Sequence, residues 1–333
     1  MKTISIVIPS YNEELNILQA YQEITKILYE KLSNYNYEIL FIDNNSSDSS
    51  QLLIESLCCK DKNVKAIFNA RNFGQPRSHF YGLINTTGDC AILLHADLQN
   101  PPSLIVDFVH EWENGHKIVI GVKDKSKESK IMYFLRTCYY KMMKYLSDID
   151  HIEHFTDFEL LDREFIDILV NLDEPLPYLR GIVSELGYGI KRVHYTQNRR
   201  ERGKTSANFK HIYEFGMIGI TSYCKFMLRI ATILGFFLSG ISIIVAIITL
   251  ILKLTNWDKY QMGVAAIGVG VFTLEAVQLF FIGLLGEFVL SINSRVMKRP
   301  LVIESKRINL PNTREKQFGE QKNNDNPPNS GSS

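Results

Sequence analysis

The chain has 333 residues, 45% of them hydrophobic, and a formal net charge of +1. This length and composition allow one large domain with a substantial core and a smaller unit beside it. The near-neutral charge argues against a general nucleic-acid binder, so we expect no nucleic-acid partner. The five cysteines are odd in number and form no Cys-x-x-Cys pair, which indicates a reduced, cytosolic protein without a zinc site.

Strand and helix signals alternate along the first hundred residues. The apolar run at residues 4–8 predicts a strand and is too short for a signal peptide, and a helical pattern through Leu15 and Leu18 opens at Asn12. Further strands are predicted at 38–42, 64–68 and 89–94, and helices after residue 48 and near 77–85. This alternation predicts an α/β fold with a mostly parallel sheet covered by helices on both faces.

Polar side chains follow two of the predicted strands. Residues 43–48 form an acidic and amide cluster, and the strand ending at Leu94 runs into His95, Asp97 and Gln99. Ligands of open parallel sheets bind beyond the carboxyl ends of the strands, where a carboxylate holds a metal against a phosphate. A plain strand and turn explains the same residues equally well. No glycine-rich dinucleotide or P-loop motif follows these strands, which weakens those two interpretations.

Two apolar runs in the last third of the chain predict membrane helices. Residues 230–252 contain no charged residue, and residues 262–286 are interrupted by Glu275. At about 1.5 Å per residue each run is long enough for the roughly 30 Å hydrocarbon core. The short linker 253–261 makes them a helical hairpin. Buried helices of a soluble domain are the less favoured alternative, because uncharged runs of this length are rare there.

The acid in the second run needs an explanation. An acidic residue near the middle of a span costs about 2.5 to 3.5 kcal/mol on insertion scales. We therefore expect Glu275 to face the partner helix, near Gln278, or a neighbouring subunit of a homo-oligomer. Helix packing with a protonated acid is slightly favoured over a functional role.

Basic residues flank the predicted hairpin and set its orientation. They are Lys225, Arg229, Arg295, Lys298, Arg299, Lys306 and Arg307. By the positive-inside bias both ends are cytosolic, which predicts a multi-pass membrane protein in contact with membrane lipids. The expected parts are a catalytic domain at 1–205, an interfacial amphipathic helix at 206–228, the two spans within 229–290, and a cytosolic tail at 291–333, disordered after about residue 315.

Several motifs of this chain occur in the same order in a known family. Those in the first hundred residues are Ile6-Val7-Ile8-Pro9-Ser10-Tyr11-Asn12-Glu13-Glu14, the cluster at Asp43, Arg71-Asn72-Phe73-Gly74 and Asp97-Leu98-Gln99-Asn100-Pro101-Pro102. Later ones are Thr156-Asp157-Phe158-Glu159-Leu160-Leu161-Asp162, Leu179-Arg180-Gly181, Arg200-Glu201-Arg202-Gly203-Lys204-Thr205-Ser206, Gly286-Glu287-Phe288 and Lys298-Arg299-Pro300. With the helix pair, the chain resembles family 2 glycosyltransferases of the GT-A fold over residues 3 to 303. Within them it resembles the polyisoprenyl-phosphate branch, which includes dolichyl-phosphate mannose synthases and GtrB-type undecaprenyl-phosphate glucosyltransferases.

The resemblance implies roles for individual residues. It assigns the nucleotide-sugar donor pocket to Pro9, Tyr11, Glu13, Asp43 and Arg71. It assigns the divalent metal to Asp97 and Gln99 with His95 beside them, and the catalytic positions to Asp97, Asp157, Arg200 and Arg202. Simple packing or turn roles for Pro9 and Tyr11, capping or pairing for Asp157, and contact of the arginines with anionic lipid remain alternatives.

The implied reaction transfers a monosaccharide to a polyprenyl phosphate. A divalent cation and arginines stabilise the leaving diphosphate, and the acceptor phosphate, with a second pKa of about 6, needs no strong general base. Lys123 and Arg136 are candidates for binding the acceptor phosphate, against an equal case for ordinary surface charges. A single in-line displacement predicts inversion at the anomeric carbon.

The chain departs from the family pattern at two places. His95 stands where the usual Asp-x-Asp has its first acid, and Asn44 and Asn45 follow Asp43 where a second acid is common. Manganese accepts mixed nitrogen and oxygen ligands better than magnesium, so His95 favours Mn²⁺ over Mg²⁺. A hydrogen-bonding role for His95 is nearly as well supported.

Two other functions fit parts of the sequence. A degenerate transferase that binds nucleotide sugar or lipid phosphate without turnover is suggested by His95 and Asn44. A processive polysaccharide synthase is less favoured, because residues 197–201 lack the tryptophan of the Gln-x-x-Arg-Trp motif and the predicted spans are few.

Overall fold

The structure, a computed structural model, describes residues 1–125, 155–172, 174–197, 216–218, 220–222, 264–297 and 299–311, and the single positions 233, 237, 241, 244, 248, 251 and 255. The chain divides into two compact units. The first, here called the sheet unit, comprises Met1–Glu128, Glu153–Thr205 and Pro300–Ser333. The second, the helical unit, comprises Ser129–Ile152 and Ser206–Arg299.

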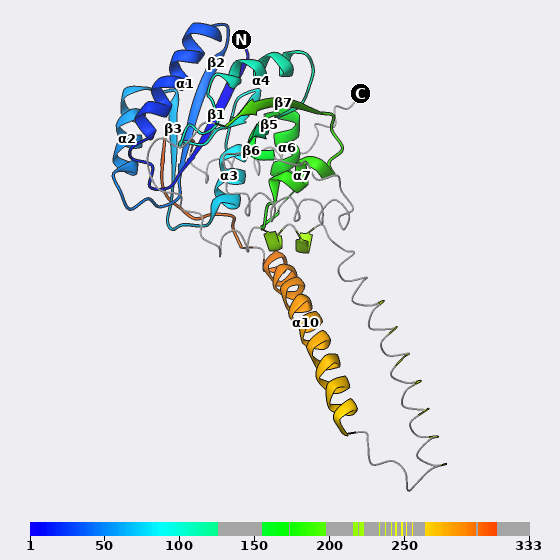
Figure 1. Ribbon diagram of the computed structural model, residues 1–333. Helices are drawn as coiled ribbons and strands as arrows, with labels where there is room; N and C mark the ends of the chain where they lie inside the picture. Colours follow the sequence, from blue (N-terminus) through cyan, green and yellow to red (C-terminus); the bar gives the residue numbers. More distant parts are fainter. Residues whose placement is uncertain are drawn as a thin grey trace, which may run out of the picture. The chain divides into compact units, whose positions relative to one another are not determined.

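An eight-stranded sheet forms the centre of the sheet unit (Figure 1). Its strands are β1 (Thr3–Ser10), β2 (Asn36–Asp43), β3 (Val64–Asn69), β4 (Cys90–Leu93), β5 (Ile118–Lys125), β6 (Phe155–Asp162), β7 (Ile190–Thr196) and β8 (Glu304–Ile308). The strand order is β7-β5-β6-β4-β1-β2-β3-β8. Only β6 and β8 run antiparallel to their neighbours, so the other six strands end at one edge, here called the carboxyl edge.

Helices cover both faces of this sheet. They are α1 (Ile17–Lys31), α2 (Ser50–Lys60), α3 (Gln75–Ile84), α4 (Leu104–Glu113), α6 (Arg163–Asn171) and α7 (Leu179–Glu185). One core joins Ile4, Ile6 and Ile8 of β1 to the buried sides of α1, α2 and α4. On the other face α3 lies so close to the sheet that a Cβ at Gly82 would sit 2.6 Å from the Val7 side chain. The predicted mostly parallel α/β sheet is confirmed.

The first helix begins later than the sequence predicts. Asn12, with a φ of 55°, belongs to a turn, and α1 starts at Ile17. The buried face of the helix is Ile17, Ala20, Ile24, Thr25 and Leu28. Leu15 and Leu18, predicted to share the apolar face of this helix, are instead 56% and 49% exposed.

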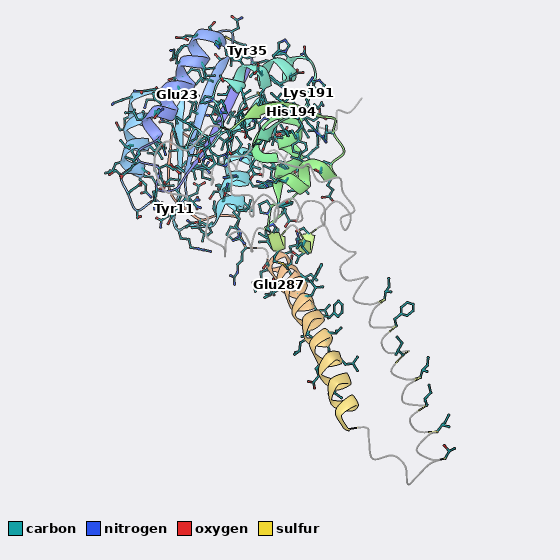
Figure 2. The ribbon with its side chains drawn as sticks, viewed as in Figure 1. Tyr11, Glu23, Tyr35, Lys191, His194 and Glu287 are labelled. Carbon is teal, nitrogen blue, oxygen red and sulfur yellow. The ribbon has the colours of Figure 1, made fainter. Side chains whose placement is uncertain are left out.

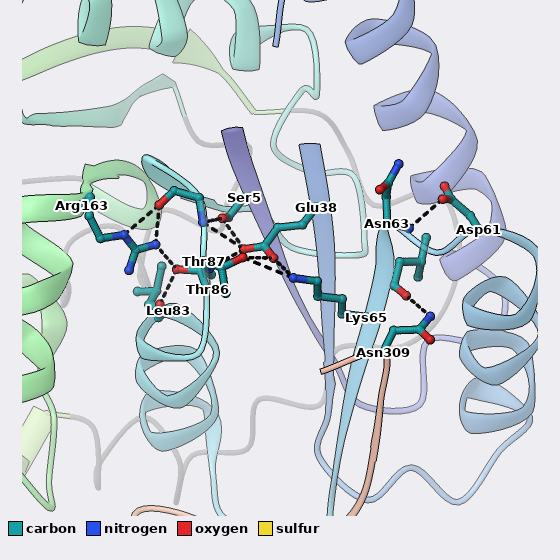
Figure 3. A network of polar contacts seen from close by, with 12 residues as sticks. Ser5, Glu38, Asp61, Asn63, Lys65, Leu83, Thr86, Thr87, Arg163 and Asn309 are labelled. Atoms are coloured by element: carbon teal, nitrogen blue, oxygen red, sulfur yellow. Dashed lines mark hydrogen bonds and ion pairs between the residues drawn. The ribbon is translucent and has the colours of Figure 1, made fainter. Parts of the chain in front are cut away.

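A buried carboxylate organises the opposite edge of the sheet (Figure 3). Glu38 of β2 accepts hydrogen bonds from the Ser5 hydroxyl at 2.5 Å and from the amide and hydroxyl of Thr87 at 2.6 and 2.7 Å, and it pairs with Lys65. Burial alone would raise the pKa of Glu38, but the contacts with Lys65, Ser5 and Thr87 outweigh burial and lower it. The network fixes the turn between α3 and β4.

A strand from the far end of the chain completes the sheet. β8 pairs antiparallel with β3, and the Ala70 amide donates to the Ile303 carbonyl just before the strand begins. Glu304 accepts from Tyr81 of α3 at 2.8 Å and from Arg307, whose guanidinium also reaches Asn85. The sequence assigned 291–333 to a tail and predicted no strand there.

In the helical unit, one described helix is long and apolar enough to cross a membrane. α10 (Val264–Val296) runs ten residues past the predicted end of the second span, and its segment Val277–Val296 has a mean hydropathy of 1.6 and is 12% buried. Core helices of soluble proteins meet the same length and composition criterion. The first apolar run is described only at single helical positions, so the hairpin stays a prediction. Arg295 of α10 donates to Ser222 at 2.8 Å.

Candidate active site

The described residues that the sequence nominates gather at the carboxyl edge of the sheet. Lys123 lies near the end of β5, and Asp157 lies near the start of β6. The others lie at or just beyond the ends of β1 to β4: Pro9, Tyr11, Glu13, Asp43, Arg71, His95, Asp97 and Gln99. Figure 2 shows Tyr11 and Tyr35 at opposite ends of the sheet unit. Arg136, Arg200 and Arg202 fall outside the described residues. Six different segments thus contribute polar groups to one edge.

Strained backbone marks the same edge. Among the described non-glycine residues, positive φ angles occur at Asn12, Asn45, Leu98, Asp157 and Asn309. The first four follow β1, β2 and β4 or stand near the start of β6. Asparagine and aspartate tolerate this conformation, whereas Leu98, at 56°, costs of order 1–3 kcal/mol. Such outliers cluster at ligand sites because the surrounding structure holds them there.

The loops after β1 and β2 bind each other. Asp43, fully buried, accepts from the Ser46 amide at 2.9 Å and from the Gln51 side chain at 2.8 Å. The Asn12 side chain accepts from the Ser47 amide at 2.8 Å, and the Asn12 amide donates to the Ser46 hydroxyl at 2.9 Å. Asp43 therefore stabilises the loop after β2, which the resemblance assigns to the nucleotide-sugar donor pocket. Its contact with a nucleotide stays a prediction.

Asn44 has a structural reason to be an amide. Its nitrogen donates to the Asn72 side chain at 2.8 Å, and its oxygen accepts from the Phe73 amide and from Asn69 at 3.0 and 3.1 Å. An aspartate here would lose the donor to Asn72. These hydrogen bonds hold the loop that contains Arg71, whose guanidinium lies 4.2 Å from the centre of the Phe73 ring.

The residues after β4 offer oxygen atoms. The Asp97 carboxylate accepts from the Gln99 amide at 3.2 Å, and the Gln99 side-chain oxygen accepts from Gln197 at 3.0 Å. Gln197 follows β7, so two distant strands meet at this segment. Both side chains are only partly buried.

His95 is held by amide side chains on both ring nitrogens. Asn100 Nδ2 lies 3.3 Å from Nδ1, and Gln75 Nε2 lies 3.3 Å from Nε2. Because the Asn100 oxygen already accepts from the Tyr195 hydroxyl at 2.7 Å, its NH₂ group must face the imidazole, which makes Nδ1 the acceptor. The proton then sits on Nε2, an assignment that turns the Gln75 oxygen toward it.

Comparison with known proteins assigns the chain to a family. Residues 5–187, more than half of the chain, match the sequence profile described as glycosyl transferase family 2. The chain belongs to glycosyltransferase family 2. It is 32% identical over 311 residues to an uncharacterized glycosyltransferase of Bacillus subtilis, YkcC, covering 93% of this chain and 95% of the relative.

Other relatives of this family 2 glycosyltransferase carry more specific names. A protein of Shigella phage SfX named bactoprenol glucosyl transferase is 30% identical over 298 residues, covering 89% of this chain and 97% of the relative. Among solved structures, a mannosyl-3-phosphoglycerate synthase from Rubrobacter xylanophilus is similar with a TM-score of 0.46, 14% identity and coverage of 70% and 75% of the two chains.

The side-chain oxygen atoms that follow β4 in this family 2 glycosyltransferase suit a hard divalent cation. Within the described ranges, no three His, Cys, Asp or Glu side chains gather as ligands. Asp97 and Gln99 nevertheless supply a carboxylate and an amide oxygen side by side, and a bound diphosphate would bring further oxygens. These two residues fit a divalent metal, and a ligand role for His95 stays a prediction. The alternative interpretation of His95 as a hydrogen-bonding residue agrees with these neighbours.

A buried ion pair beneath this segment escaped the sequence analysis. Asp157 is bound by Arg180 of α7 through two hydrogen bonds of 2.6 and 2.8 Å. Burial would raise the pKa of Asp157, but Arg180 and, less strongly, His79 and His95 lower it. The motif containing Arg180 signalled its importance but not its partner, which lies 23 residues away in the chain.

Two more titratable groups lie beside this pair. Burial lowers the pKa of His79 to about 3, with His95 adding to the effect, and the His79 and His95 ring centres are 5.2 Å apart. Glu159 is fully buried, and neither of its oxygens has a hydrogen-bond partner among the described residues. Burial and the Asp157 charge raise the pKa of Glu159 well above its ordinary value.

Proposed function

We propose that this glycosyltransferase moves a monosaccharide from a nucleoside-diphosphate sugar to a polyprenyl phosphate on the cytosolic face of a bacterial membrane, giving a lipid-linked sugar for glycan modification. The observation that carries the proposal is the similarity, over most of both chains, to proteins named bactoprenol glucosyl transferase. The apolar segment Val277–Val296 agrees with an enzyme whose acceptor is a membrane lipid.

The carboxyl edge offers groups for each part of the reaction. Arg71 and the loops after β1 and β2 are suited to hold the nucleotide, with Tyr11 exposed beside them. Asp97 and Gln99 would hold the divalent cation, which neutralises charge on the leaving diphosphate. Lys123, near the end of β5, remains a candidate for the acceptor phosphate.

The chemical step is a single displacement. An oxygen of the lipid phosphate attacks the anomeric carbon, the bond to the diphosphate breaks, and the nucleoside diphosphate leaves with the electron pair. The attacking phosphate is already ionised, so Asp157 is not required as a strong base. Its ion pair with Arg180 suits it to orient sugar hydroxyls, and one displacement inverts the anomeric centre.

The full-length protein in lipid vesicles tests this proposal. It is given undecaprenyl phosphate, each of several labelled nucleotide sugars, and Mg²⁺ or Mn²⁺. We expect one donor to give a labelled sugar-phosphate lipid, and Asp97→Ala to reduce its formation by a factor of about 100 or more. Arg163→Lys, on the opposite edge, serves as the control. Absence of lipid product with every donor and metal, despite nucleotide-sugar binding, would instead favour the non-catalytic alternative.

A further inference from the structure

Large apolar side chains are exposed at the carboxyl edge of the sheet unit. Five of them, here called the apolar rim, are Tyr11 (38% exposed), Leu15 (56%), Leu18 (49%), Leu52 (70%) and Ile303 (57%). The other strongly exposed apolar residues described in this unit are Met1, Tyr29, Val170 and Leu172. The rim residues come from three distant stretches of the chain, yet all follow strand ends or precede β8 at one edge.

Local geometry brings part of the rim together. The starts of α1 and α2 are bound together, because the Glu13 amide donates to the Ser50 hydroxyl and the Ser49 amide donates to Glu14, both at 2.9 Å. Side chains in the first turn of a helix tilt toward its N-terminus. Leu18 and Leu52 occupy the first turns of these two helices, so both point toward the carboxyl edge.

The charges around the rim are compatible with a lipid surface. Its acids are already engaged: Asp48 accepts from the Glu14 and Ser50 amides, and Glu14 accepts from Ser49. Both lie at helix starts, where the helix dipole offsets negative charge.

A short stretch of chain links this edge to the apolar helix. Residues 297–303 connect the apolar helix α10 to β8, and the Ile303 carbonyl is fixed to the Ala70 amide at 2.8 Å. The segment leaving the candidate span therefore joins the sheet at the carboxyl edge. This short covalent link favours a bilayer, rather than a soluble partner, as the occupant of the rim.

We propose that the apolar rim contacts the bilayer, with the leucines of the α1 and α2 starts inserted at the boundary between headgroups and acyl chains. This inference rests on the proposed function, because a lipid acceptor requires the carboxyl edge to lie at the membrane. The rim holds the site at the depth where the lipid phosphate is found. Residues of α1 and α2 thereby take part in acceptor use without touching the reacting atoms.

Fluorescence quenching by lipid tests the contact directly. Leu18→Trp and Leu52→Trp are made in the full-length protein and reconstituted into vesicles with or without brominated phospholipid, and the signal of wild-type Trp112 and Trp257 is subtracted. We expect brominated lipid to quench both added tryptophans by about half. Tyr29→Trp, equally exposed at the opposite edge, is expected to show no quenching.

Three outcomes would overturn the proposal. Added tryptophans that acrylamide quenches but brominated lipid does not would place the rim in water. Tryptophans shielded from both quenchers would place it against a second copy of the chain. Quenching equal to that of Tyr29→Trp would mean that the rim has no special contact.

A transfer assay separates this contact from the proposed function. Combined Leu15→Glu, Leu18→Glu and Leu52→Glu changes should lower transfer to undecaprenyl phosphate in vesicles about tenfold, while transfer to a short-chain acceptor in detergent is unchanged. Lipid quenching without transfer to any acceptor would refute the function and leave the contact standing. Transfer without quenching would refute the contact alone.

Discussion

At the scale of single residues, the carboxyl edge combines partly exposed polar side chains with buried, paired ones. Asp97 and Gln99 remain partly exposed, whereas Asp157 is paired with Arg180 below them. A buried ion pair contributes little net stability. It is costly to break, because removing one partner leaves the other charge buried and unsolvated. The pair therefore ties the position of the Asp157 carboxylate to the integrity of the fold.

Removing one member of that pair should be worse than removing both. We expect Arg180→Met to destabilise the sheet unit by about 3–5 kcal/mol, since it leaves Asp157 buried and alone. Adding Asp157→Asn should recover part of the loss. Thermal unfolding midpoints of the solubilised single and double variants measure the coupling. Equal destabilisation by the single and the double change would contradict this expectation.

The contacts of His95 lead to a prediction about metal preference. Because amides lie beside both ring nitrogens, we expect His95→Gln to leave the ratio of Mn²⁺-supported to Mg²⁺-supported activity unchanged. Titration of each metal in the transfer assay measures this ratio. A shift toward Mg²⁺ in the variant would instead support the prediction that His95 selects manganese.

At the scale of elements, local patterns predicted β1 to β4 because each is a short apolar run ending in polar residues. They missed β8, since Glu304–Ile308 is polar and becomes a strand only against the open edge of β3. They also placed Leu15 and Leu18 on the buried face of α1, although the helix begins only at Ile17, after the turn at Asn12, and both leucines are exposed. In the site, strand ends were predictable, but the pairing of Asp157 with Arg180 depends on the tertiary fold.

The network around Glu38 should make the stability of the sheet pH-dependent. A carboxylate whose pKa is lowered by folding stabilises the protein above its unfolded pKa of about 4.3, and this contribution disappears as the pH falls through the folded value. We expect Glu38→Gln to cost about 1–3 kcal/mol at pH 7. The difference in unfolding midpoint from wild type should shrink below pH 4. A constant difference from pH 7 to pH 3.5 would argue against this origin.

At the scale of the whole molecule, a sheet unit and an apolar helix are described, and the predicted hairpin and homo-oligomer remain to be tested. We expect Asn256→Cys, in the linker between the two apolar runs, to react with an impermeant maleimide in intact cells. The background carries Cys59→Ser, Cys138→Ser and Cys224→Ser. Ser56→Cys in the sheet unit is the control and should react only after lysis. Labelling of both sites, or of neither, in intact cells would contradict the predicted topology.

The position of β8 in the chain has a consequence for biosynthesis. Because Glu304–Ile308 follows α10, the ribosome must complete both apolar runs before the last strand of the sheet exists. Until then the edge of β3 stays unpaired, and the contacts of Glu304 and Arg307 with α3 and Asn85 cannot form. The catalytic fold is thus finished only after the hydrophobic segments have been synthesised, which times maturation of the enzyme to its arrival at the membrane.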